Sequence, residues 1–227
     1  MYVGAFPLWV TLLQWLSPKT DATTVPVTET SHMQMSQRTS LRAGDDGRAQ
    51  TVLAGARRVV VRYGDLAAAQ RDGYRLFHEE PVGHEEHYTN WRLAQAEGRG
   101  IEPDRPGSLL YRHEADGTRR IVGVMYGAPA GAGPAELDAR LPRSIATWHR
   151  HVDFCWGARD SAATDDRFGF AGSIHEPEPC RAAGGAFVPV VFGWMTHVYP
   201  GESDPRRVWG GEVMQMDDRA PHEPMRM

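Results

Sequence analysis

One helical segment is followed by a series of short apolar runs that turn signals separate, and this order restricts the fold. Over residues 51–73, apolar residues recur near the 3.6-residue helical spacing, and Asp72-Gly73 supplies a stop. Two short apolar runs, 109–112 and 120–126, flank Asp116-Gly117 and predict a β-hairpin. Further strands are expected over 145–154 and 186–199. The sequence therefore predicts an α+β fold, in which an antiparallel β-sheet or a barrel-like core carries one long N-terminal helix on one side.

The length and the distribution of polar residues indicate one globular domain with tails. The chain has 227 residues, of which 41% are hydrophobic, enough for one substantial core. Residues 1–20 form a possible signal or apolar segment, and residues 21–50 are expected to be a disordered linker because they lack an apolar period. Residues 51–200 are predicted to form a single globular α+β domain, and residues 201–227 a polar tail.

The apolar run at residues 3–16 bears on where the protein resides. It is shorter than the roughly 20 residues that a membrane-spanning helix needs, but its length suits the core of a signal peptide. No basic residue precedes the run, and no A-x-A site follows it closely. We expect a secreted or periplasmic protein with no stable membrane span, and a cytoplasmic protein if this segment is not a signal. The net charge of −4 gives no indication of a nucleic-acid partner.

Two cysteines, Cys155 and Cys180, enclose 24 residues. In an oxidising compartment a disulfide closing this loop would stabilise the fold by about 3 kcal/mol. In the cytosol both residues would be buried thiols. A third interpretation is that Cys155, four residues after His151, is a thiolate ligand.

Histidines concentrate in three segments of the chain. His149 and His151 form an H-x-H pair, and in a strand two residues at this spacing point to the same face. His197 lies in an apolar segment expected to cross the core, and His87 precedes a tyrosine. Because neutral imidazole is the commonest metal ligand, we predict a metal site formed by His87, His149, His151 and His197. The alternative is a set of hydrogen-bonded core histidines.

Three further side chains are possible additions to this site: His84, Glu86 and His175. His84 and His87 are three residues apart, so both could bind from one helical turn or from a loop, and Glu85 and Glu86 could orient an imidazole. The spacing differs from the H-E-x-x-H motif of zinc proteases. A cluster of imidazoles suits zinc or copper best, while iron, nickel and manganese are also possible.

Methionine pairs occur in three places, Met33-Gln34-Met35, Met214-Gln215-Met216 and Met225-Arg226-Met227. The first directly follows His32, and paired thioethers near a histidine can bind Cu(I). A few such pairs among nine methionines are also expected by chance.

The order of several motifs resembles a group of uncharacterised secreted bacterial proteins. In that group a helix ending near A-x-G-Y is followed by G-x-G-Y-H-Y, then by D-P-x-R-P and a hairpin. The corresponding segments here lie within residues 55–126: 68–74, 83–90, 103–106 and 109–126. The resemblance implies no established activity, but it favours His87 over His84. The chain departs from the group at Glu86, where the group has Tyr, and at Met125, where it often has an acidic residue.

The H-x-H pair followed by a distant histidine also resembles, more weakly, the metal site of cupin barrels. That resemblance implies a metal-dependent oxygenase or isomerase. The glutamate that cupins place shortly after H-x-H is missing here, with Asp153 too near and Asp160 the only later candidate.

The sequence thus leads to three functional hypotheses. The first is an exported bacterial protein that binds one transition metal ion through the histidine cluster, with an unknown reaction. The second is a non-catalytic binding or structural module without a metal. In this second case an unknown small molecule could occupy a cleft lined by tryptophans at positions 91, 148, 156 and 194. The third is the cupin-like enzyme. No G-x-S-x-G or phosphate-binding loop is present.

Overall fold

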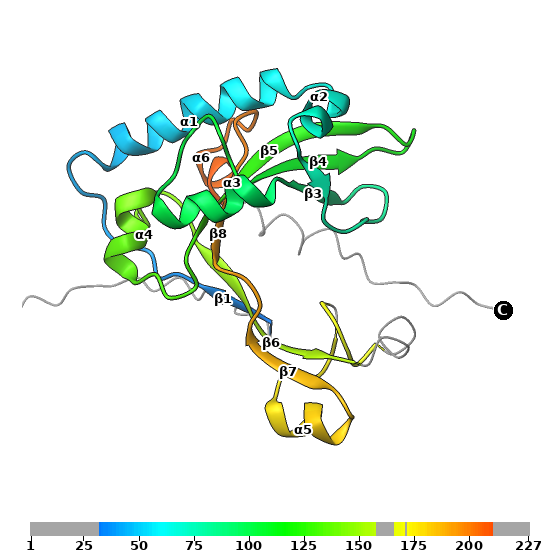
Figure 1. The fold of residues 1–227 in the computed structure, drawn as a ribbon. Coiled ribbons are helices and arrows are strands. Elements are labelled where there is room, and N and C mark those ends of the chain that lie inside the picture. The colour runs from blue at the N-terminus through cyan, green and yellow to red at the C-terminus, as the bar shows by residue number, and fades with distance from the viewer. Residues whose placement is uncertain (1–31, 158–165, 171, 211–227) are drawn as a thin grey trace, which may run out of the picture.

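The computed structural model describes residues 32–157, 166–170 and 172–210, and in this part of the chain the longest helix covers one face of an antiparallel sheet (Figure 1). The strands are β1 (Met33–Met35), β2 (Arg75–Leu76), β3 (Glu85–Thr89), β4 (Ser108–His113), β5 (Arg119–Ala128), β6 (His149–Trp156), β7 (Ala186–Val190) and β8 (Trp194–Val198). The helices are α1 (Asp45–Arg62), α2 (Leu66–Arg71), α3 (Trp91–Ala96), α4 (Pro134–Arg140), α5 (Pro177–Ala182) and α6 (Pro205–Val208), with a 3-10 turn, η1 (Glu97–Arg99). The predicted α+β class with an antiparallel sheet is confirmed.

The sheet is open, so the barrel-like alternative is wrong. Its strand order is β1-β6-β8-β5-β4-β3-β2, with β7 paired to β6, and no pairing among the described residues joins β1 to β2. Both terminal strands are very short, three residues in β1 and two in β2. Short terminal strands leave few backbone groups for closure or for pairing with another chain.

The single helix expected over residues 51–73 is two helices. α1 already begins at Asp45, whose acidic side chain suits the positive end of the helix dipole. It ends at Arg62, and the carboxylate of Asp65 then accepts a hydrogen bond of 2.9 Å from the N–H of Ala67, which caps the start of α2. Because Gly64 has low helix propensity, a newly capped helix is favoured over one continuous helix.

The main core lies between α1 and the sheet. The apolar stripe of α1 packs on the face formed by alternate residues of β3, β4, β5 and β8. Each fully buried large side chain of this kind stabilises the fold by about 1.5–3 kcal/mol. Residues of this core include Val52, Leu53, Ala56, Val59, Tyr88, Leu109, Tyr111, Val124, Tyr126 and Val198. The opposite face of the same strands is therefore left for other roles.

Local signals correctly predicted several strands. The hairpin around Asp116-Gly117 is confirmed as β4 and β5, and Gly117 has the positive φ of 82° that the turn requires. The segment 186–199 forms the two strands β7 and β8. Pro189 lies in β7, which pairs only with β6 among the described strands, as expected for a residue that lacks a backbone N–H.

The expected linker and tail are shorter than the sequence indicated. Met33 to Met35 pair with β6, and α1 starts before residue 50, so the linker prediction fails over residues 32–50. At the other end, Val208 and Trp209 are buried in the core. The apolar segment 1–20, the rest of the linker and the tail from residue 211 lie outside the described residues. Of the helices that the structure describes, none has the length and apolar character required to span a bilayer.

The predicted disulfide is confirmed, and the free-thiol and thiolate-ligand interpretations of Cys155 are wrong. Cys155 on β6 and Cys180 on α5 are bonded, with their Cα atoms 5.5 Å apart. Both are fully buried against Phe168 in a small second core. The bond therefore joins α5 to the end of β6 that extends beyond the main sheet (Figure 1).

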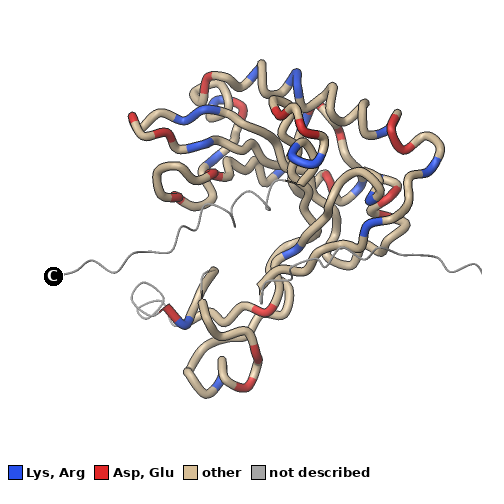
Figure 2. Tube along the Cα trace, turned by 180° about the vertical axis from the view of Figure 1, so that it is seen from behind, with Lys and Arg blue, Asp and Glu red and all other residues tan. Residues whose placement is uncertain are grey.

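Charged residues of both signs are interspersed along the described chain (Figure 2). Several form exposed ion pairs, such as Arg58 with Asp104 at 2.6 Å and Arg62 with Asp72 at 2.6 Å. Exposed pairs of this kind each contribute about 0–1 kcal/mol. The charges thus add little to stability compared with the core.

Candidate metal centre

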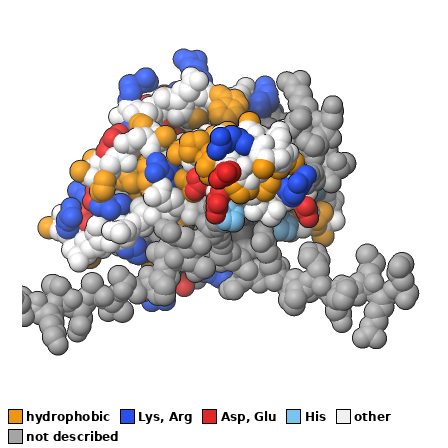
Figure 3. Space-filling model, turned by 90° about the horizontal axis from the view of Figure 1, so that it is seen from below, with side chains coloured by type: hydrophobic (Ala, Val, Ile, Leu, Met, Phe, Trp, Pro, Cys, Tyr) orange, Lys and Arg blue, Asp and Glu red, His pale blue; other side chains and the backbone are white. Residues whose placement is uncertain are grey.

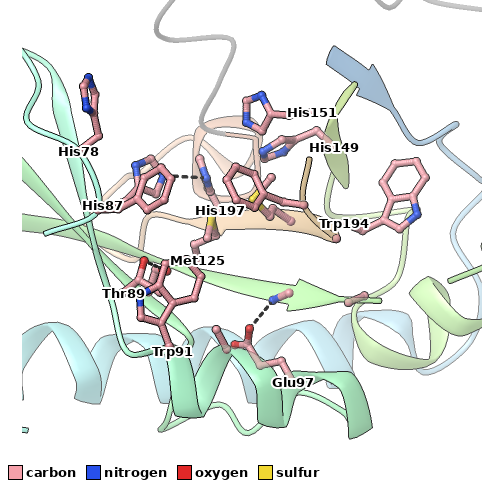
Figure 4. Close-up of a pocket in the computed structure, with 18 of the residues that line it drawn as sticks. His78, His87, Thr89, Trp91, Glu97, Met125, His149, His151, Trp194 and His197 are labelled. Carbon is pink, nitrogen blue, oxygen red and sulfur yellow. Dashed lines mark hydrogen bonds between the residues drawn. The ribbon is translucent and has the colours of Figure 1, made fainter. Parts of the chain in front are cut away.

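The four histidines predicted as metal ligands come together on the sheet face that α1 does not cover (Figure 4). His87 lies on β3, His149 and His151 on β6, and His197 on β8. The Nε2 atoms of His87 and His197 are 3.5 Å apart. The ring centre of His149 lies 5.0 Å from that of His197 and 5.9 Å from that of His151. Side chains separated by up to 110 residues in sequence therefore form one cluster.

Strand register explains why these side chains share a face. Directly paired residues on neighbouring antiparallel strands point to the same side of a sheet. His197 pairs with Met125 on β5, and His149 pairs with Met195 on β8. His87 pairs with Leu110 on β4. The face that carries the imidazoles thus runs continuously from β3 to β6.

The approach of His87 to His197 requires space above the strands between them. β3 and β8 are three strand spacings apart, about 14 Å for flat strands at about 4.8 Å each. The two side chains must therefore lean toward each other over β4 and β5. Gly123 on β5 leaves room beside them for Tyr199, since a Cβ there would lie 3.0 Å from Cδ1 of that ring.

The ring of His197 is oriented by a tyrosine and a buried glutamate. The hydroxyl of Tyr199 donates a hydrogen bond of 2.7 Å to Oε2 of Glu85 and lies 3.2 Å from Nδ1 of His197. Because the hydroxyl proton goes to Glu85, its oxygen can accept from an N–H at Nδ1 of His197. This pattern favours the tautomer in which the lone pair of Nε2 faces His87. Metal-binding histidines usually donate this N–H to a carboxylate, a backbone carbonyl or water, and here a tyrosine hydroxyl held by a carboxylate takes that place.

The distance between the Nε2 atoms of His87 and His197 suits two ligands of one metal ion better than a direct hydrogen bond between the rings. Hydrogen bonds with an N–H donor are usually about 2.7–3.2 Å long, shorter than the 3.5 Å found here. Two nitrogens bound at about 2.0–2.1 Å to a tetrahedral ion lie about 3.3–3.4 Å apart. The pair formed by His87 and His197 is thus close to the spacing of two ligands.

The other two imidazoles are near this pair but not in ligand positions. Within the described residues, no group of three or more His, Cys, Asp and Glu side chains already has the geometry to hold a metal ion. The ring of His149 is almost perpendicular to that of His197, at 81°. Rotation of the His149 or His151 side chain would direct a third ring nitrogen toward the space between the Nε2 atoms of His87 and His197.

Glu86, a predicted addition to the site, points to the opposite face. It is fully buried and accepts hydrogen bonds of 2.9 and 3.1 Å from Arg119. Burial raises the pKa of Glu86, but the hydrogen bonds and charge of Arg119, the backbone of Glu80 and the charge of His113 together outweigh burial, so the net pKa is lowered. Side chains alternate along a strand, so Glu85, two residues before His87, faces the cluster instead.

The other two predicted additions have different positions. His84 is exposed in the turn before β3 and lines the cavity next to the cluster. His175 is exposed outside this cavity, with Nδ1 3.2 Å from the carbonyl oxygen of Ser173. His175 therefore lies apart from the cavity that the other predicted residues line. On the face seen in Figure 3, histidine side chains reach the surface beside acidic ones.

A cavity of about 760 Å³ adjoins the imidazoles. This volume is in the range of small-molecule sites. Trp91 and Trp194, two of the four tryptophans proposed for a ligand cleft, line it, whereas Trp148 is fully buried in the core and Trp156 stacks on Phe154. The remaining apolar wall consists mainly of Phe77, Phe170, Phe192, Met125 and Met195.

Glu97, at the far side of the cavity from the imidazoles in Figure 4, was not predicted. Its carboxyl oxygens accept hydrogen bonds of 2.7 and 2.8 Å from the backbone N–H groups of Gly107 and Gly127. Burial raises the pKa of Glu97 to about 8, although these two bonds and Arg140 act in the opposite direction. The carboxyl group therefore exchanges a proton near neutral pH, in a cavity beside the histidines.

The sequence indicated that Glu85 or Glu86 could orient an imidazole, but it did not indicate Tyr199 or Glu97. The spacing of two residues between Glu85 and His87 favours Glu85, because residues at this spacing in a strand share a face. The same spacing links Tyr199 to His197. No local signal identifies Glu97, because its partners are backbone groups 10 and 30 residues away.

Comparison of this chain with protein-family models, with curated proteins and with solved structures gives no match. The geometry of the site is therefore the basis for the functional conclusion.

Proposed function

We propose that this protein binds one transition metal ion through His87 and His197, with His149 or His151 as further ligands. The observation that carries this proposal is the pair of Nε2 atoms 3.5 Å apart, with Nδ1 of His197 next to the hydroxyl of Tyr199. A hydrogen bond at Nδ1 places the lone pair of His197 on Nε2, the atom that faces His87, and a metal ion binds such a lone pair. The resemblance to uncharacterised secreted bacterial proteins agrees with a role for His87.

The ligand set favours zinc or copper, and iron, nickel and manganese bind to imidazoles under other constraints. With three imidazoles bound, a fourth position would face the cavity and could hold water or a substrate group. The ion held by these imidazoles would supply Lewis acidity to that water or substrate group. Glu97, on the other side of the cavity, could accept or donate a proton.

The disulfide supports export as part of the same proposal. Structural disulfides persist in oxidising compartments such as the periplasm or the extracellular space. The bond between Cys155 and Cys180 is buried, so it has the character of a structural link. The open sheet removes the architectural basis for the cupin-like alternative.

Metal analysis of the untagged full chain tests the proposal. After expression in a medium with trace metals, mass spectrometry should find about one equivalent of metal per chain. His87→Ala and His197→Ala should each lose it, while His175→Ala, outside the cavity, should retain it. Circular dichroism checks that each variant is folded. A folded wild-type protein that binds no ion in titrations with zinc and copper would refute the proposal.

A second candidate function is the binding of an apolar small molecule without a metal. The cavity of about 760 Å³ with its aromatic wall is the observation that favours it. In this case a chelator-treated protein should bind a fluorescent apolar probe at one saturable site, and Trp91→Ala should weaken the binding. If the protein binds the metal ion and the probe at the same time, both functions belong to one site.

A further inference from the structure

Four methionines lie on the same sheet face as the four histidines, and each is the direct cross-strand neighbour of a cluster histidine. On β1, Met33 pairs with His151 and Met35 pairs with His149. Met195 on β8 also pairs with His149. Met125 on β5 pairs with His197.

This register places the four methionine side chains on the sheet face that carries the imidazoles. Side chains of directly paired residues have Cβ atoms about 4.5–5.5 Å apart and point to the same side. Met125, labelled in Figure 4, and Met195 both line the cavity that the cluster faces. Met33 and Met35 flank the cluster on its other side, on the strand next to His149 and His151.

Methionine is not the residue that packing or strand propensity would favour at these positions. β-branched and aromatic residues are preferred in strands. Met33, Met35 and Met125 are only half-buried, so a tightly packed core does not require a flexible side chain there. What methionine adds to a leucine of similar volume is a soft, polarizable thioether.

We propose that the metal held by this cluster is copper, and that Cu(I) is bound by imidazole together with thioether from these methionines. The inference rests on the metal-binding function proposed above and specifies its ion. Soft thioether and thiolate ligands select Cu(I), whereas zinc gains nothing from a thioether when imidazoles are available. Both cysteines of the chain are in the disulfide, so the soft ligands at hand are the methionines.

The proposal is tested by comparing Cu(I) and Zn(II) affinities of the full chain. Cu(I) is titrated without oxygen in the presence of ascorbate, in competition with the chromophoric ligand bicinchoninate. Zn(II) is titrated in competition with a zinc indicator. The variants are M125L/M195L in the cavity and M33L/M35L on β1. Replacement of Met by Leu conserves volume, so both should fold.

We expect each double variant to bind Cu(I) at least about tenfold more weakly and to bind Zn(II) as the wild type does. X-ray absorption of the Cu(I)-loaded wild type, which needs no variant, should show sulfur bound to copper. Equal loss of Cu(I) and Zn(II) affinity in both variants, or unchanged Cu(I) affinity with only nitrogen bound to copper, would overturn the inference. The metal-binding function itself would survive either result. It would fail only if neither ion binds.

Discussion

Replacing Glu97 by glutamine should remove a strong pH dependence of stability. The carboxyl group is buried against backbone N–H groups, and its pKa is about 8 in the folded chain, compared with an ordinary value of 4.5. A pKa higher by about 3.5, at about 1.36 kcal/mol for each pH unit, corresponds to about 5 kcal/mol. Water that enters the cavity reduces this value, so 5 kcal/mol is an upper limit.

The sign follows from linkage between proton binding and folding. Because the folded state holds the proton more tightly than the unfolded state, the stabilisation is fully present below about pH 4.5. It is lost as the pH rises through about 8. The free energy of unfolding of the wild type, minus that of the Glu97→Gln variant, should therefore fall by up to about 5 kcal/mol across this range.

Urea unfolding followed by tryptophan fluorescence measures this difference at a series of pH values. The protein is kept metal-free with a chelator, so that metal binding does not add its own pH dependence. Subtraction of the variant cancels the titration of the histidines, which both proteins share. Glu102→Gln, which removes an exposed carboxyl group, serves as the control. A difference that stays constant from pH 4.5 to 9 would refute the reasoning, because it would mean that burial does not control this group.

Three further predictions concern the site and its frame. Gly107→Ala should destabilise the fold by about 1–3 kcal/mol in urea unfolding, since its Cβ would lie 2.6 Å from Oε2 of Glu97. The control Gly98→Ala, which has open space around its Cβ, should change stability little, and equal effects of the two substitutions would contradict the prediction. Tyr199→Phe should weaken metal binding about 10–100-fold by releasing His197, while Tyr126→Phe, on the opposite face, should not; equal affinities in a competition titration would argue against the orienting role. Reduction of the Cys155–Cys180 disulfide should lower the free energy of unfolding by about 3 kcal/mol, measured by urea unfolding with and without reductant. An unchanged urea midpoint would mean that the disulfide does not restrict the conformational entropy of the unfolded chain.

Features fixed by neighbouring residues were predictable. The hairpin of β4 and β5 follows from its turn residues, and the common face of His149 and His151 follows from strand alternation. The break between α1 and α2 was also encoded locally, by Gly64 and the capping carboxylate of Asp65, but a continuous apolar period concealed it.

Register errors explain what went wrong at the site. Glu85 and Glu86 were both candidates to orient an imidazole, but Glu86 was taken as the possible member of the site without a strand assignment. A shift of one residue exchanges the two faces of a sheet. β1 was taken for part of a linker because a strand of three residues has almost no pattern of its own. It exists through its pairing with β6.

The sequence by itself determined the class of the fold, the pairing of its two cysteines as one possibility, and four histidines as candidate ligands. Only the tertiary structure decided that β8 lies between β5 and β6, which brings His197 between His87 and the H-x-H pair. It also decided which carboxylate faces the cluster and that methionines surround it. The physical reason is that strand order and register depend on long-range backbone pairing and core packing, which no short stretch of the chain specifies.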